Sequence, residues 1–329
     1  MVKPAKRGPT RRRILTISLY AVCWLSLTML SPFWLVLAAL VGLARRRSFI
    51  LLRLLVFAWF YFGLELIALV LVAWTLATRR SAESRIGDLY RLQAWWANAT
   101  LLIATKLLRL RFVVVGADCA TPGPSILLIR HASILDTLLP SVFVQRPHGF
   151  RVRYVLKQEL LFDPCIDIVG NALPNYFVDR TGNTQREVAG IAALAEGLGT
   201  DGVLMFPEGT RFSPQKRQRA LQKLETEASP LLARAHELTH VLPPKPAGVL
   251  ALLDALPKVD CVFLAHTGLE TFAKIRDLMS GAVVGSTVHV YLWRVDANDI
   301  PTTTDERLRW LYAQWSRVNA FVRNAHETF

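Results

Sequence analysis

Residues 125–136 read SILLIRHASILD, and this stretch predicts both the fold class and a candidate site. A strand is expected at 125–130, because residues 125–129 form a short apolar run. His131 then falls where the strand ends, and a helix is expected near 134–144. In α/β proteins, polar side chains at strand ends project into the crevice where sites lie.

His131 and Asp136 can meet only if the chain turns between them. In a continuous helix, residues five apart point about 140° away from each other, because each residue turns about 100°. Given a turn, Asp136 can accept from one imidazole nitrogen while the other takes a proton from an alcohol. Alternatively, Ser133 caps a helix and Asp136 completes a capping box, which leaves His131 incidental. The two roles are compatible.

The chain around this stretch alternates short apolar runs with longer amphipathic segments from about residue 83. This pattern predicts an α/β fold with a mixed, mostly parallel sheet flanked by helices. Strands are expected at 111–116, 125–130, 151–156, 202–206, 247–252, 259–265 and 288–295. Helices are expected near 83–109, 134–144, 184–198, 214–239 and 304–325.

Three further motifs follow expected strands or precede them. FPEGTR at 206–211 offers Gly209, which permits close backbone approach to a ligand, and Arg211, whose planar fork suits a phosphate. YFVDR at 176–180 ends in Arg180, which can hold an anionic headgroup, although Asp179 and Arg180 also suit a local ion pair. VLPP at 241–244 forms a turn that could shape an acyl pocket. Each motif alone also fits an ordinary structural role.

Two other chemistries are disfavoured. Ser133 lacks the flanking glycines of a nucleophile elbow, so covalent serine catalysis is not expected. No second histidine near His131 gives zinc-ligand spacing, and the four cysteines lie far apart without a paired motif. No metal or other cofactor is therefore predicted.

The N-terminal part has the composition of a membrane segment. Residues 14–44 carry no charge, and 48–78 carry only Arg53 and Glu65. About 20 apolar residues span a bilayer, so two membrane-embedded helices are expected. The basic residues before 14 favour a cytoplasmic N-terminus, yet a plain two-span hairpin would put the arginines 45–47 on the wrong side. A hairpin broken at Ser31–Pro32 within one leaflet, or interfacial helices with snorkelling arginines, would resolve this.

The charge balance favours an anionic partner. The chain has 39 Lys+Arg against 25 Asp+Glu, a formal net charge of +14. No zinc-finger or RNA-binding motif accompanies this charge, so phospholipid headgroups and CoA phosphates are better partners than nucleic acid. The sequence divides into a basic tail at 1–13, membrane helices at 14–80 and a catalytic domain at 81–329. Oligomeric state is not predicted.

Taken in order, the motifs at 131–136, 177–180, 206–211 and 241–244 resemble those of the glycerolipid acyltransferases, and most closely the 1-acylglycerol-3-phosphate acyltransferases. The segments 288–290 and 299–301 look more loosely like the lysophosphatidate and lysocardiolipin branch. The resemblance implies that His131 is the base and Asp136 its orienting partner. It also implies that the glycerol phosphate is bound by Arg180, Glu208, Gly209, Thr210 and Arg211, with Lys157 nearby.

The resemblance implies acyl transfer from acyl-CoA or acyl-carrier protein to 1-acyl-glycerol-3-phosphate, giving phosphatidic acid. Another lysophospholipid acceptor, a lipid hydrolase and a non-enzymatic membrane scaffold are the alternatives. The family usually has Asn where this chain has Arg130, a cation that could keep His131 neutral or bind an acceptor phosphate. The expected location is a membrane, specifically a bacterial inner membrane with the catalytic domain facing the cytoplasm.

Overall fold

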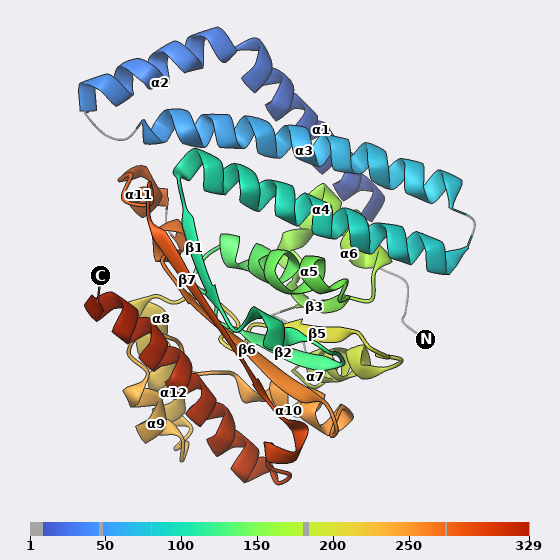
Figure 1. Ribbon diagram of the computed structural model, residues 1–329, viewed down its shortest axis with the longest axis vertical. Coiled ribbons are helices and arrows are strands. Elements are labelled where there is room, and N and C mark those ends of the chain that lie inside the picture. Colours follow the sequence, from blue (N-terminus) through green and yellow to red (C-terminus); the bar gives the residue numbers. More distant parts are fainter. Residues whose placement is uncertain (1–8, 46–48, 80, 180–183, 274, 329) are drawn as a thin grey trace.

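The computed structural model describes residues 9–45, 49–79, 81–179, 184–273 and 275–328 (Figure 1). Its core is a seven-stranded sheet with the order β1-β7-β6-β2-β5-β3-β4. Neighbouring strands run parallel except for β6 and β7, which pair antiparallel. This confirms the predicted mixed, mostly parallel sheet. The strands are β1 (Arg111–Val115), β2 (Ser125–Ile129), β3 (Val152–Lys157), β4 (Tyr176–Val178), β5 (Gly202–Met205), β6 (Asp260–Thr267) and β7 (Thr287–Val295).

The strand β2 lies between β6 and β5, and all five of its residues are buried. Because side chains alternate along a strand, Ile126 and Leu128 pack into the core on one face, while Leu127 and Ile129 pack on the other. Both faces are covered, which explains why the run 125–129 is apolar throughout. His131 follows directly at the carboxyl end of this central strand.

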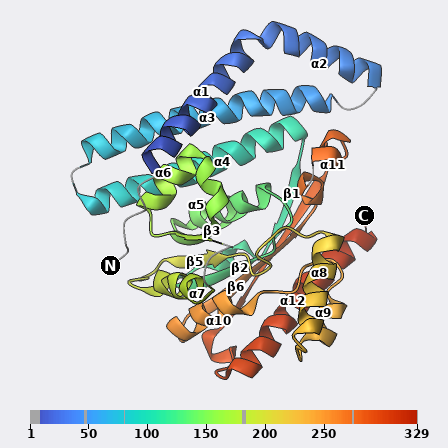
Figure 2. The same ribbon diagram turned by 180° about the vertical axis from the view of Figure 1, so that it is seen from behind.

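Helices cover both faces of the sheet (Figures 1 and 2). One face carries α4 (Ala82–Leu108), η1 (Ala117–Ala120), η2 (Leu135–Leu138), η3 (Ser141–Gln145), α5 (Arg146–His148), η4 (Gln158–Phe162) and α6 (Pro164–Ala172). The other carries α7 (Thr184–Ala192), η5 (Ala193–Ala195), α8 (Pro214–Thr226), α9 (Leu232–Glu237), α10 (Pro246–Ala255) and α12 (Thr304–Thr328). The remaining short elements are η6 (Glu270–Ala273), α11 (Ile275–Met279) and η7 (Ala297–Asp299).

The expected strand at 247–252 is wrong, because these residues belong to the helix α10. Pro246 stands in its first turn, where the missing N–H costs nothing, and the following alanines and leucines are strong helix formers. The expected helix at 214–239 is divided into α8 and α9. The short edge strand β4 was not among the predicted strands.

The N-terminal helices α1 (Pro9–Met29), α2 (Ser31–Arg45) and α3 (Ile50–Thr78) form a layer outside α4 (Figure 1). By length and composition, α3 could cross a bilayer. The apolar helices α1 and α2 pass the same test only as a pair, and they are bent by 72° at the break between them. This bend falls at the predicted break before Ser31–Pro32, so the first apolar stretch is two helices.

Polar contacts attach this layer to the rest of the protein. Arg12 and Arg13 of α1 both pair with Asp167 of α6, at 2.9 Å and 3.1 Å, and the Asp167 side chain is fully buried. Tyr61 of α3 donates a 2.6 Å hydrogen bond to Asp163, which also caps α6 through the N–H of Ile166. Two of the basic residues before the first apolar stretch are thus bound to α6.

Candidate active site

The turn between β2 and η2 brings His131 and Asp136 together. The Nδ1 atom of His131 lies 3.1 Å from Oδ1 of Asp136, and both side chains are buried. Asp136 Oδ2 accepts from the backbone N–H groups of Ala132 and Ser133, at 2.6 Å and 2.7 Å. The Ser133 hydroxyl oxygen accepts in return from the N–H of Asp136 at 3.2 Å. The two predicted sets of contacts therefore occur together, because the capping box turns Asp136 toward His131.

This arrangement fixes the roles of the two imidazole nitrogens. A carboxylate only accepts hydrogen bonds, so Nδ1 of His131 carries the proton and Nε2 keeps its lone pair. Burial lowers the pKa of His131 below 6.5; the bond to Asp136 opposes this effect, and the charges of Lys157 and Arg211 reinforce it. Burial would raise the pKa of Asp136, yet its bonds with His131 and His266 hold it well below its ordinary value. At neutral pH, a neutral base therefore faces an ionised carboxylate.

Two cations stand near the free nitrogen of the pair. Lys157, the last residue of β3, places its Nζ atom 3.3 Å from Nε2 of His131. Arg211 of the 206–211 motif is partly exposed, and its charge acts on His131. An anionic group held by these two cations would lie close to Nε2.

Glu208 connects the motif at 206–211 to two other segments. Its Oε1 atom accepts from the N–H of His131 and its Oε2 atom from the N–H of Leu242, both at 2.9 Å. The side chain is 1% exposed, and burial raises its pKa to about 7, against the nearby charge of Arg130. The carboxylate thereby holds the 131, 208 and 242 segments together. Its predicted role in phosphate binding stays a prediction.

Gly209 and Thr210, two more of the predicted phosphate-binding residues, belong to this loop. Gly209 has a positive φ of 65° and donates its N–H to Phe206 O at 2.8 Å, closing a tight turn. The hydroxyl oxygen of Thr210 accepts from Lys216 Nζ at 2.9 Å. Phe212 N–H donates to His131 O at 3.2 Å, which brings the loop against the base. Arg180 lies outside the described residues.

Sequence reasoning missed His266, which lies beside Asp136. His266 Nε2 is 3.4 Å from Asp136 Oδ2 and 3.0 Å from the backbone oxygen of Arg130. A lone histidine in the apolar strand β6 gives no signal until the pairing of β6 with β2 is known.

Arg130 is buried beside this pair. Its guanidinium donates to Glu270 at 2.6 Å and to His266 O at 2.5 Å, and it is 1% exposed. Burial would raise the pKa of Glu270, but the charge of Arg130 lowers it to about 2. The Arg130 side chain therefore serves a buried ion pair, and binding a phosphate would require breaking it.

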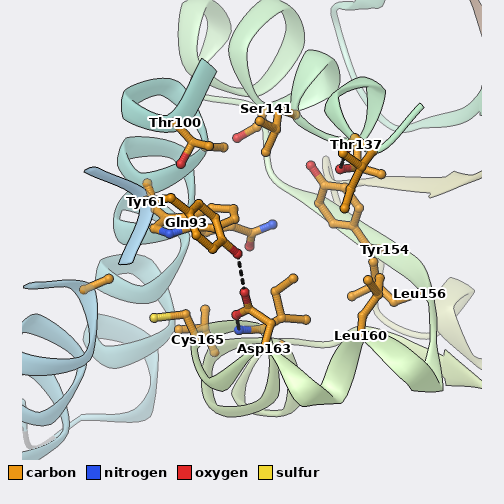
Figure 3. A pocket seen from close by; sticks show the side chains of 18 of the residues that line it. Tyr61, Gln93, Thr100, Thr137, Ser141, Tyr154, Leu156, Leu160, Asp163 and Cys165 are labelled. Atoms are coloured by element: carbon orange, nitrogen blue, oxygen red, sulfur yellow. Dashed lines mark hydrogen bonds between the residues drawn. The ribbon is translucent and has the colours of Figure 1, made fainter. Parts of the chain in front are cut away.

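A cavity of about 500 Å³ lies where the N-terminal helices and α4 meet the elements at one edge of the sheet (Figure 3). Its walls come from α1, α3 and α4 on one side and from η2, β3, η4 and α6 on the other. Most of the side chains that line the cavity are apolar. The ring of Phe206 lines this cavity and also packs against the imidazole of His131, with ring centroids 4.7 Å apart. The cavity therefore lies beside the histidine–aspartate pair.

Within the described ranges, no group of three or more His, Cys, Asp or Glu side chains is arranged to hold a metal ion. The site instead offers a neutral base with an orienting carboxylate, two nearby cations and an adjoining apolar cavity. These parts suit proton removal from the hydroxyl group of an anionic, lipid-like substrate.

Comparison with known proteins agrees with this chemistry. Residues 111–243 match the family model described as acyltransferase. The fold is similar to the crystal structure of PlsC, the 1-acyl-sn-glycerophosphate (LPA) acyltransferase from Thermotoga maritima, with a TM-score of 0.52 and 16% identity. The match covers 95% of this chain and 97% of that one. No curated protein matches the chain by sequence.

The matched segment contains His131 and Asp136, the 206–211 motif and the Leu242 backbone that Glu208 holds. The candidate catalytic residues thus lie within the segment that matches the family model. Residues 111–243 of this chain therefore match an acyltransferase family model, and the chain has the fold of the Thermotoga maritima protein.

Proposed function

We propose that this protein transfers a fatty acyl group from a thioester, acyl-CoA or acyl-carrier protein, to the free hydroxyl of 1-acyl-glycerol-3-phosphate. The product is phosphatidic acid. The observation that carries this proposal is the His131–Asp136 pair. The unprotonated Nε2 atom of His131 lies near Lys157 and Arg211, and the pair adjoins an apolar cavity.

His131 acts as the general base in this reaction. Its Nε2 atom takes the hydroxyl proton as the substrate oxygen attacks the thioester carbonyl carbon. A carbon–oxygen bond forms, the carbon–sulfur bond breaks, and the departing thiolate takes the proton back from the imidazolium. Asp136 stabilises that imidazolium through Nδ1, so no acyl-enzyme is required.

Lys157 and Arg211 hold the acceptor phosphate. Both cations act on His131, so a phosphate between them would place the glycerol hydroxyl within reach of Nε2. Arg180 joins them in this proposal through the family resemblance. Such positioning can supply several kcal/mol of the roughly 7–11 kcal/mol that orientation contributes to catalysis.

The acyl chain lies in the cavity shown in Figure 3. An apolar space of about 500 Å³ is within the range of ordinary ligand pockets, and the membrane-like helices α1 and α3 form part of its wall. In this proposal, lipid substrates enter from the bilayer, while the CoA or carrier-protein part of the acyl donor stays in water. We propose that the protein is membrane-bound and that its catalytic domain faces the cytoplasm.

Acyl transfer by purified protein in detergent, with labelled oleoyl-CoA and a panel of lysophospholipids, tests this function. Lysophosphatidate should be the preferred acceptor, with no free fatty acid released. His148→Ala, at an exposed histidine on α5, serves as the control for His131→Ala and should be fully active. Preference for another lysophospholipid would show that the acceptor is a different lipid and that the reaction is still acyl transfer. Release of free fatty acid without an acceptor would indicate a hydrolase.

A further inference from the structure

Arg130 and His266 hold each other by reciprocal hydrogen bonds at adjacent ends of β2 and β6. The guanidinium Nη1 of Arg130 donates to His266 O at 2.5 Å, and the imidazole Nε2 of His266 donates to Arg130 O at 3.0 Å. Arg130 N–H also donates to Leu264 O at 3.0 Å. These bonds fix the backbone immediately before His131.

The reciprocal bonds determine the tautomer of His266. A backbone carbonyl only accepts, so Nε2 of His266 must carry its proton. The same Nε2–H faces Asp136 Oδ2 at 3.4 Å, while Nδ1 has no hydrogen-bond partner among the described residues. The imidazole is fully buried. This N–H group is therefore hydrogen-bonded to the Arg130 carbonyl and also faces the Asp136 carboxylate.

We propose that His266 is a positioning residue for the reaction, acting through Asp136: its Nε2–H, 3.4 Å from Oδ2, is a third N–H group directed at that oxygen. The other two are the N–H groups of Ala132 and Ser133. Nδ1 of His131 lies nearer to Oδ1, at 3.1 Å, than to Oδ2, at 3.3 Å. All three N–H groups act on Oδ2, so they limit the negative charge that the carboxylate directs at His131. This inference rests on the proposed function, because it assigns His131 as the base.

The charged groups around His131 and His266 determine whether loss of the His266 donor raises or lowers the pKa of His131. His131 is faced by Asp136, Lys157 and Arg211, and burial lowers its pKa. His266 itself is faced by Asp136, Arg130 and Glu270. Removal of the His266 donor leaves the two backbone donors on Oδ2, so Asp136 stays in place. More of its negative charge then acts on His131, which raises the pKa of His131.

The test compares His266→Leu with His266→Gln, because glutamine keeps a side-chain N–H donor and leucine has none. In His266→Leu, the acid limb of the kcat/KM profile should shift to higher pH by about one unit. At a fixed pH on that limb, kcat/KM should therefore be about tenfold lower than in wild type. His266→Gln should restore the wild-type limb. His289→Leu, on the paired strand β7, is the matched control and should not move it.

A second measurement shows whether His266 acts through Asp136. In an Asp136→Asn background, His266→Leu should cause no further loss of residual activity, because contacting residues that act together are not additive. Additive losses, or an acid limb that stays in place in folded His266→Leu protein, would overturn the proposal. A glutamine variant that behaves like leucine would also overturn it.

Nuclear magnetic resonance titration of His131 separates this proposal from the proposed function. The pKa of His131 should rise in His266→Leu whether or not lysophosphatidate is the acceptor. If wild-type protein is inactive with every acceptor, the proposed function fails, and the titration still decides the role of His266.

Discussion

The carboxylates in two buried regions of this protein have opposite surroundings. At the candidate active site, both oxygens of Asp136 and of Glu208 accept hydrogen bonds. At the boundary with the N-terminal helices, Glu65 is equally buried, and neither of its oxygens has a hydrogen-bond partner among the described residues. Thr100 and Ser141, which line the cavity there, also have unpaired hydroxyl groups within the described chain.

The difference shows where the fold is rigid and where it can adapt. A buried polar group with all its partners holds one geometry, which a general base requires. A buried group without partners destabilises the fold by about 1–3 kcal/mol. The carboxylates of the candidate site thus fix positions, while the boundary region, where we propose that the acyl chain binds, keeps unpaired polar groups beside the cavity. Four substitutions test this contrast.

Asp136→Asn should have the largest effect. The amide keeps the size of the side chain but cannot stabilise the imidazolium, and its N–H groups conflict with the backbone donors of Ala132 and Ser133. We expect kcat to fall roughly 10³–10⁴-fold, as for the loss of an orienting aspartate elsewhere. Steady-state kinetics measure this, with Asp305→Asn at the exposed start of α12 as the control. Activity within tenfold of wild type would contradict the assignment.

Glu208→Ala should mainly destabilise the protein. It leaves the N–H groups of His131 and Leu242 buried without their acceptor, at about 1–3 kcal/mol for each. We expect the free energy of unfolding to fall by about 2–6 kcal/mol, together with activity, because His131 loses its backbone anchor. Denaturation in detergent measures the change against exposed Glu196→Ala. Unchanged stability would show that Glu208 does not hold these segments.

Ala97→Phe should change acyl-chain selectivity. Ala97 of α4 is 3% exposed and lines the cavity, so a phenyl ring there shortens the available space. We expect the rate with the longest accepted chain to fall about tenfold relative to short chains, since one or two methylenes are worth about 1–3 kcal/mol. Competition between acyl-CoA lengths measures this ratio. Ala99→Phe, outside the cavity lining, should keep the wild-type ratio, and an unchanged ratio in Ala97→Phe would place the chain elsewhere.

Glu65→Leu should have the smallest effect, and a favourable one. Replacing an unpaired buried carboxyl by an apolar side chain removes its desolvation cost, so stability should rise by about 1 kcal/mol. Thermal unfolding in detergent measures the change, with Glu65→Gln as a polar comparison. A large loss of stability would show that Glu65 has a hydrogen-bond or charge partner, so that the buried carboxylates of both regions would be paired.

The sequence predicts the parts of the fold that have local signals. The apolar run at 125–129, the five-residue spacing of His131 and Asp136 and the loop at 206–211 all lie where expected. The strand expected at 247–252 failed because a short apolar run does not distinguish a strand from a buried helix. His266 could not be found, because its contact with Asp136 depends on the order of the strands.

The central claim is that neutral His131 is the base, and kcat/KM against pH for wild type and His131→Ala tests it most directly. Because the pKa of His131 is lowered from 6.5, the wild-type acid limb should lie below that pH, with activity lost only as His131 becomes protonated. His131→Ala should lose about 10²–10⁴-fold and show no such limb. A His131→Ala variant that keeps wild-type activity, or a limb that persists without His131, would contradict the account.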